Sequence, residues 1–300
     1  MTPNAPLTIE NEFVRVVVLP DFGARVVSLI DKASSRDWMA KGGVSTNTGE
    51  DAVYSVDEAV GWDECFPTVS RWDAAGTAWN RKLRDHGDLW GRPWQIESQT
   101  RTSLHTVFAG TGFRFNRTLS LEGRKVTANY AVDNTSATPL PFLWALHSLL
   151  ATLPGEEIRL PGTNRLVVTF LSLDGRRIET TELAWPGAAN VLPFPIDQVQ
   201  SIDSRFMGKF FAPHQASASV GGVNGWLDME WEGIEHLGIW IAYGAWPTPG
   251  AIHHLALEPT SDPLDHLGQV LDRGTTPAIP PGTTRSWRVS MTLRGPAATA

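Results

Sequence analysis

Three short segments of the sequence place side chains that can move protons next to apolar or aromatic ones. They are residues 85–90, residues 141–148 with His147 near the end, and residues 254–260 with Glu258 just before a proline. Histidine titrates near neutral pH, so it can give or take a proton there. Partial burial raises the pKa of a carboxyl group and makes it a usable base. These residue types predict general acid–base chemistry.

The predicted strands place the two central residues on defined faces. Alternation along residues 141–148 separates His147 from the large apolar side chains Phe142, Trp144 and Leu146. Alternation along residues 254–260 puts Glu258 on the face of His254 and Ala256. Taken singly, a histidine in an apolar strand is commonly a core residue, and a strand-end glutamate is commonly solvated. The His86 segment taken alone indicates a turn.

Strand signals dominate the elements that must hold these residues. Apolar side chains alternate over residues 113–121, 126–132, 237–243 and 287–293, and turn pairs such as Glu122-Gly123 and Asp174-Gly175 lie between the strands. Short strands at about 8–12-residue intervals predict an antiparallel sandwich or barrel. One helix is predicted over residues 263–271, with Ser261 or Asp262 as its N-cap.

Residues 40–85 break the strand pattern, being rich in Gly, Asp and Glu. A long irregular stretch in a compact domain is often functional. Nothing in the sequence reads as an interdomain linker, so we expect a single β domain over residues 1–300.

Composition narrows the class of protein. The chain has 300 residues, 42% of them hydrophobic, and a net charge of -7, which argues against a nucleic-acid binder. No stretch approaches the roughly 18 apolar residues of a membrane span. The single cysteine, Cys65, allows no internal disulfide, and without a visible secretory signal we expect a soluble cytoplasmic protein. Of the 13 tryptophans, some are expected to stack on the C–H face of a sugar.

The order of these motifs along the chain resembles the galactose mutarotase-like (aldose 1-epimerase) superfamily. Residues 22–31, FGARVVSLID, and residues 62–68, WDECFPT, also resemble segments of that family, the second in its less characterised members. The similarity runs from about Asn11 to Leu293. It implies an all-β fold, a large antiparallel β-sandwich (a supersandwich) with few short helices, with a sugar in a groove across the concave sheet.

The resemblance also implies residue roles. His147 matches the catalytic acid, Glu258 the catalytic base, and His86 the histidine on the ring-oxygen side of the sugar. Glu258 would take the proton of the anomeric hydroxyl while His147 protonates the ring oxygen, the ring would open, and reclosure would give the other anomer. This aldose 1-epimerase (mutarotase) chemistry needs no metal or redox cofactor. The expected partner is a monosaccharide or sugar derivative, and the expected state is a monomer or homodimer.

The residues expected to read the sugar hydroxyls differ from the family pattern. Characterised galactose mutarotases carry an Asn-Arg pair before the first histidine and an aromatic-Phe-Asn run after the second. Here Arg71 is the nearest plausible arginine, and Ser148-Leu149-Leu150 follows the second histidine. We therefore expect His86, Asp63, Glu64, Arg71 and Trp90 to bind the substrate, and the sugar is left open.

Three other classes compete with this interpretation. A non-catalytic carbohydrate-binding β-sandwich would need no acid–base pair. A metal-dependent, cupin-like isomerase would use His86, His147 and Glu258 as ligands, although tight His-x-His spacing is absent. A lyase or glycosidase would need other groups, for hydrolysis two carboxylates across the bond. The enzyme interpretation requires His147 and Glu258 to face one cavity.

Overall fold

The computed structural model describes residues 5–42, 49–188, 191–247, 252–274 and 277–296. It confirms the predicted all-β class, with two large antiparallel sheets. The described helices are one α-helix and three 3₁₀-helices: α1 (Leu267–Arg273), η1 (Pro20–Phe22), η2 (Val56–Glu58) and η3 (Ile202–Ser204). None of the helices in these ranges is long and apolar enough to span a membrane.

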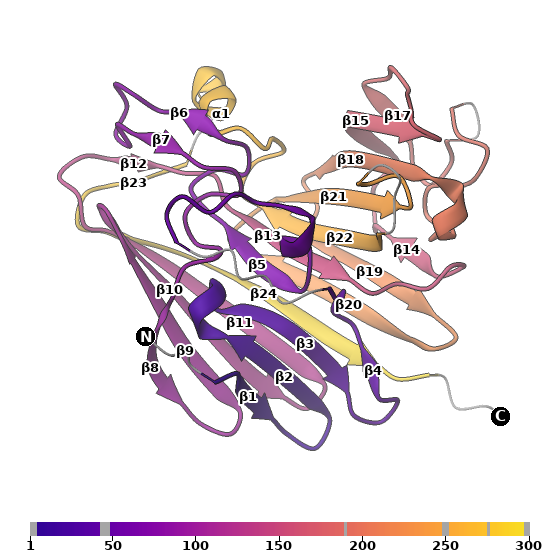
Figure 1. Cartoon of the computed structure of the whole chain (residues 1–300), viewed down its shortest axis with the longest axis horizontal. Coiled ribbons are helices and arrows are strands. Elements are labelled where there is room, and N and C mark those ends of the chain that lie inside the picture. Colours follow the sequence, from indigo (N-terminus) through magenta and orange to yellow (C-terminus); the bar gives the residue numbers. More distant parts are fainter. Residues whose placement is uncertain (1–4, 43–48, 189–190, 248–251, 275–276, 297–300) are drawn as a thin grey trace.

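The larger sheet has 12 strands in the described residues. The strands that carry residues 62–65, 145–150 and 253–260 lie at its centre (Figure 1). Its main order is β1 (Leu7–Glu10), β2 (Val14–Leu19), β3 (Arg25–Asp31), β5 (Trp62–Cys65), β13 (Ala145–Leu150), β22 (His253–Thr260), β21 (His236–Tyr243), β18 (Phe206–Pro213), β15 (Arg165–Leu173) and β16 (Arg176–Arg177). Two short strands pair at its sides, β4 (Arg36–Asp37) with β3 and β17 (Glu182–Ala184) with β15.

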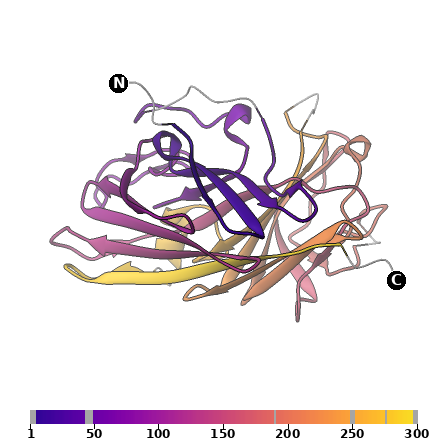
Figure 2. The ribbon, with the colours of Figure 1, turned by 90° about the horizontal axis from the view of Figure 1, so that it is seen from below.

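The second sheet has eight strands and forms a layer of its own, as Figure 2 shows beneath the indigo strands β1–β3. Its order is β14 (Glu157–Arg159), β19 (Ser217–Gly222), β20 (Gly225–Glu232), β24 (Thr284–Arg294), β11 (Lys125–Asn134), β10 (Phe113–Glu122), β9 (Ser103–Gly110) and β8 (Gln95–Gln99). Two small ribbons complete the described strands: β12 (Leu140–Pro141) with β23 (Ala278–Ile279), and β6 (Trp72–Asp73) with β7 (Lys82–Leu83).

The predicted alternation is confirmed in the strands that build the core. The apolar residues singled out in β10, β11, β21 and β24 are all buried. Those of β10, β11 and β24 join one hydrophobic cluster with buried residues of the larger sheet, such as Val26 and Leu146. Burial of these side chains between the sheets drives the two layers together.

The helix prediction was wrong at its N-terminal end. The helix begins at Leu267 rather than Pro263, and its N-cap is His266, whose side chain accepts a hydrogen bond from the Gln269 amide. Residues 261–266 have other partners: the Ser261 hydroxyl accepts from the Trp144 amide at 2.9 Å, and the Asp265 carbonyl accepts from two amides of residues 69 and 70. These contacts hold the segment as a loop over the sheet.

Strand register brings the two predicted catalytic residues together. In the pair β13–β22, Ala145 lies opposite Thr260 and Leu149 opposite Ala256, so the antiparallel register puts His147 opposite Glu258. Residues opposite one another on neighbouring strands have Cα atoms about 5 Å apart and project to the same face. On the other side of β13, His147 lies opposite Asp63 of β5.

Candidate functional site

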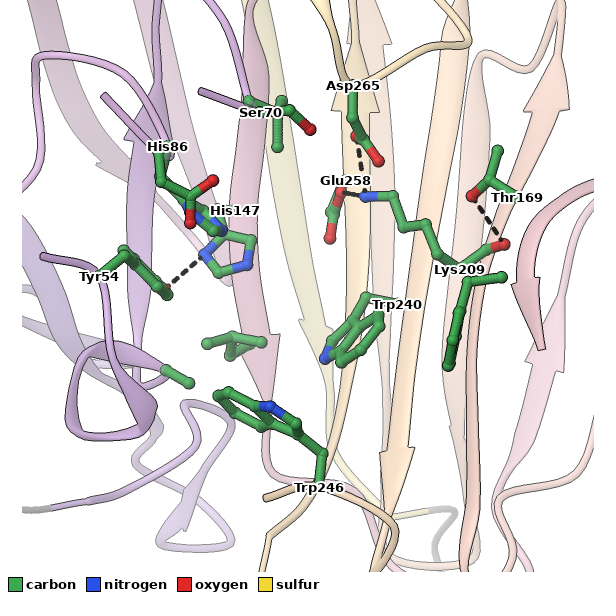
Figure 3. A pocket seen from close by; sticks show the side chains of 15 residues that line it. Tyr54, Ser70, His86, His147, Thr169, Lys209, Trp240, Trp246, Glu258 and Asp265 are labelled. Carbon is green, nitrogen blue, oxygen red and sulfur yellow. Dashed lines mark hydrogen bonds and ion pairs between the residues drawn. The ribbon is translucent and has the colours of Figure 1, made fainter. Parts of the chain in front are cut away.

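A pocket of about 370 Å³ lies over the centre of the larger sheet. This volume falls in the range of small-molecule sites. Figure 3 shows polar side chains gathered around one part of the pocket and Trp240 and Trp246 at another. The described lining residues are Tyr54, Ala59, Val69, Ser70, Asp85, His86, His147, Leu149, Thr169, Phe170, Lys209, Trp240, Trp246, Glu258 and Asp265.

The pocket is on the face of the sheet turned away from the second sheet. Glu64 of β5 points toward the second sheet, where it contacts Arg117 and Tyr130 at 3.1 and 3.0 Å. Successive strand residues point to opposite faces, so Asp63 projects to the pocket side. His147, which lies opposite Asp63, projects there too.

His147 is held through one ring nitrogen. Its Nδ1 lies 3.0 Å from Oδ1 of Asp63 and 3.1 Å from the hydroxyl of Tyr54. Because the ring lines the pocket, Nε2 is the nitrogen left to meet a ligand (Figure 3). This is the arrangement that a proton donor or acceptor requires.

Asp63 is itself held by a buried cation. Its Oδ2 accepts from the Arg25 guanidinium at 2.8 Å, and Arg25 also pairs with Glu58 at 3.3 Å. Burial alone would raise the pKa of Asp63, but the Arg25 charge and the His147 hydrogen bond outweigh it and hold that pKa below its usual value. Asp63 is therefore a buried, ionised carboxylate beside His147.

His86 enters the pocket from a loop with left-handed backbone. Its Nδ1 lies 3.1 Å from Oδ2 of Asp85, and its ring stacks on Tyr54 with centroids 3.6 Å apart. The rings of His86 and His147 have centroids 5.0 Å apart. Two imidazoles thus share one wall of the pocket.

Glu258 lies in an ion-paired cluster on β22, the strand next to that of His147. Its Oε2 contacts the Lys209 ammonium, which also lies 3.3 Å from Oδ1 of Asp265. Burial would lower the pKa of Lys209, but the charges of Asp265 and Glu258 raise it overall. Lys209 is therefore a cation. Gly238 of β21 leaves room for the pair, since a Cβ there would lie 3.0 Å from Oε2 of Glu258 and 3.4 Å from Nζ of Lys209.

The aromatic part of the pocket has one fixed ring. Trp240 donates its indole N–H to Nε2 of His254 at 3.1 Å. Burial lowers the pKa of His254 to about 3, so the imidazole is neutral and can accept this bond. Trp246 meets Trp240 edge-on, with centroids 6.4 Å apart and an interplanar angle of 85°. The flat face of a tryptophan ring in a pocket lining suits the C–H face of a sugar.

The structure brings together three of the residues predicted from sequence. His147, Glu258 and His86 line the same pocket, which meets the condition set for the enzyme interpretation.

The other four predicted residues are placed differently and are reassigned. Asp63 is buried beside His147 and bonds both His147 and Arg25. Glu64 points into the core between the sheets, because it is one residue further along the strand. Trp90 is buried under Tyr54 and donates to the Asp85 carbonyl at 2.8 Å. Arg71 is exposed, and its main chain bonds the Asp85 carboxylate. None of the four is among the lining residues.

Several lining residues were not predicted. Tyr54 lies in the irregular stretch that was expected to be functional, but nothing singled it out there. Lys209 carried a signal that was missed, a lone cation in the otherwise apolar run Phe206–Pro213. Trp240 and Trp246 fall under the general expectation that some tryptophans face a sugar, but neither was singled out, and Asp265 showed no signal.

No three His, Cys, Asp or Glu side chains in the described ranges are grouped so that they could hold a metal ion. The described structure therefore does not group His86, His147 and Glu258 as the ligands of a metal ion.

Sequence comparison and structure comparison differ in what they find. No protein-family model and no curated protein matches the sequence. Solved structures do match. A putative aldose 1-epimerase of Escherichia coli K12 has a TM-score of 0.70 at 18% identity, over 97% of this chain and 99% of that one.

Two further structures agree. A galactose mutarotase related enzyme of Lactobacillus acidophilus has a TM-score of 0.68 at 15% identity, over 99% of both chains. A galactose mutarotase-like protein of Clostridium acetobutylicum has a TM-score of 0.68 at 14% identity, over 97% of this chain and 95% of that one. Nearly the whole chain therefore has the fold of the galactose mutarotase-like and aldose 1-epimerase structures, as its sequence motifs predicted.

Proposed function

We propose that the protein interconverts the anomers of a reducing sugar by acid–base ring opening, with His147 as the acid and Glu258 as the base. The observation that carries the proposal is their placement opposite one another on β13 and β22, lining one pocket. The aldose 1-epimerase and mutarotase names of the structural neighbours support the same chemistry.

The proposed reaction needs one proton given and one taken. The imidazolium of His147 donates from Nε2 to the ring oxygen as the bond from C1 to that oxygen breaks. The Glu258 carboxylate takes the proton of the C1 hydroxyl, and the open-chain aldehyde forms. After rotation about the C1–C2 bond, the two residues return the protons in the reverse sense and the ring closes as the other anomer. Each positioned group contributes about 10²–10⁴-fold.

The charges in the pocket favour a sugar without an acidic substituent. Lys209 is the only lysine or arginine among the described lining residues, and it is paired with both Glu258 and Asp265. Asp85 adds a further carboxylate. A phosphate or carboxylate on the sugar would meet net repulsion there. We therefore propose a neutral aldose as the substrate.

The test is anomer exchange measured by NMR on a panel of neutral aldoses and their 6-phosphates. We expect wild-type exchange above the buffer rate for at least one neutral aldose and slower exchange for its phosphate. His147→Ala and Glu258→Gln should each lower kcat by about 10²–10⁴-fold, because each removes a proton-transfer group.

His253→Gln is the matched control, since His253 is on the same strand but bonds the Gln200 carbonyl at 2.8 Å outside the pocket lining. Equal exchange in wild type and both catalytic variants would reject the mechanism.

One contact favours a second candidate, a non-catalytic carbohydrate-binding protein. The Lys209 ammonium engages the Glu258 oxygen that a base would use. In that case sugars would bind the wild type, as followed by tryptophan fluorescence, while exchange stayed at the buffer rate.

A further inference from the structure

We infer that Asp63 is a positioning residue that sets the tautomer of His147, so that the pocket-facing Nε2 is the atom that gives and takes the proton. This inference rests on the proposed function. Asp63 is 1% exposed and is not among the pocket-lining residues, so it acts through His147 rather than on the sugar.

The hydrogen-bond partners allow only one tautomer of neutral His147. An ionised carboxylate only accepts, so the contact of 3.0 Å between Asp63 and Nδ1 requires the proton on Nδ1. The Tyr54 hydroxyl donates to the Glu58 carbonyl at 3.2 Å, so its oxygen, 3.1 Å from Nδ1, can only accept there. Burial raises the pKa of Tyr54, which keeps this hydroxyl protonated.

This tautomer serves both directions of the reaction. In neutral His147 the lone pair of Nε2 faces the pocket and can take a proton. In the imidazolium the same nitrogen carries a proton and can donate it. The other tautomer would present an N–H of neutral imidazole, which is a far weaker acid, and would have no free base in the pocket.

Arg25 makes Asp63 suitable for this task. Its guanidinium donates to Oδ2 at 2.8 Å, while His147 uses Oδ1. The two oxygens are thereby assigned to different donors. Arg25 is itself buried and also paired with Glu58, so the carboxylate is held by a cation that is not among the pocket-lining residues.

Asp63→Asn replaces one acceptor oxygen of the carboxylate by an NH₂ group, which donates. Arg25 only donates, so it will hold the amide oxygen, and the amide NH₂ will face Nδ1 of His147. Nδ1 must then accept, and the proton moves to Nε2. We expect ¹⁵N NMR of the histidine rings, at a pH where His147 is neutral, to show Nδ1–H in the wild type and Nε2–H in the variant. We also expect kcat to fall at least about 10-fold with KM changed less than about 3-fold.

Asp31→Asn is the matched control. Asp31 is 2% exposed, lies in the same sheet and pairs with Arg124 at 2.7 Å, but it contacts no imidazole in the described structure. It should leave the His147 spectrum and kcat unchanged. His147→Gln assigns the His147 signals by their loss.

Two results would overturn the inference: Nε2–H in wild-type His147, or retention of Nδ1–H in Asp63→Asn. The wild-type spectrum alone can overturn the inference, so the test also works if Asp63→Asn does not fold. The ¹⁵N spectrum needs no turnover. If the protein shows no anomer exchange, the proposed function is rejected, and the tautomer of His147 can still be measured.

Discussion

At the scale of single residues, the pocket depends on side chains whose charge is set by what surrounds them. His254 shows this most directly. It shares a strand face with Glu258, yet burial lowers its pKa to about 3, and as a neutral imidazole it anchors Trp240. This histidine is thus a hydrogen-bond acceptor that fixes an aromatic side chain of the pocket.

The lowered pKa of His254 predicts a pH-dependent stability. His254 binds a proton near pH 6.5 in the unfolded state and near pH 3 in the folded state. Its contribution to the stability of the fold is therefore fully present above pH 6.5 and is lost as the pH falls toward 3. The loss should be about 1.4 kcal/mol per pH unit. Denaturant unfolding of wild type and His254→Gln at pH 7, 6 and 5 measures it. The free energy of unfolding of the wild type, relative to that of His254→Gln, should fall as the pH is lowered. A difference that does not change with pH would contradict the lowered pKa of His254.

At the scale of elements, loops place the pocket residues that the strands do not. The loop before β8 brings His86 onto the larger sheet by packing Gly87 against Phe66. The Asp88 amide donates to the Phe66 carbonyl at 2.6 Å, and Gly87 has φ +73°. A Cβ on Gly87 would lie 2.5 Å from the Phe66 carbonyl carbon and 2.8 Å from its amide nitrogen, so only glycine fits.

Gly87→Ala should therefore destabilise the fold by more than backbone strain alone. Gly76→Ala is the control, because Gly76 has φ +78° and nothing lies within 4 Å of its added Cβ. The control should cost about 1–2 kcal/mol, and Gly87→Ala should cost at least about 2 kcal/mol more through the backbone clash. Thermal or denaturant unfolding compares them. Equal losses would show that the loop moves freely to admit the methyl group.

At the scale of the whole molecule, the two sheets are joined by a polar cluster as well as by the apolar core. Glu64 of the larger sheet accepts from Trp62, Arg117, Tyr130 and Trp144 at 3.0–3.1 Å. Burial raises the pKa of Glu64 to about 7, although the Arg117 charge and the bonds from Trp62 and Tyr130 lower it, so the carboxylate is the main form at pH 8. The charge of Arg117, from the second sheet, compensates it.

Arg117→Met should cost about 3–5 kcal/mol at pH 8, because it leaves a buried carboxylate without its cation. Arg114→Met is the control on the same strand, since Arg114 pairs with Glu97 at 2.8 Å on the surface and should cost less than about 1 kcal/mol. Urea unfolding gives both values. A loss below 1 kcal/mol for Arg117→Met would show that the inter-sheet cluster does not need its charge.

The amino-acid sequence was enough to predict the fold class and to single out three residues that line the pocket, His86, His147 and Glu258. Alternation over residues 113–121 and 287–293 predicts strands because a sheet buries every second side chain. His147 and Glu258 could be placed on strand faces for the same reason. Alternation also separates Asp63 from Glu64, but both are buried, and a period of two does not say which face carries the pocket.

Which distant residues meet follows from the three-dimensional fold and could not be predicted from the sequence patterns. Lys209, Glu258 and Asp265 come from β18, β22 and the loop before α1. Their contact depends on the order of the strands in the sheet, which alternation within one strand does not encode. The same holds for Asp63, whose place beside His147 follows from the pairing of β5 with β13. Local periodicity settles which side chains are buried, whereas the neighbours of a buried charge, and with them its role, follow from long-range pairing.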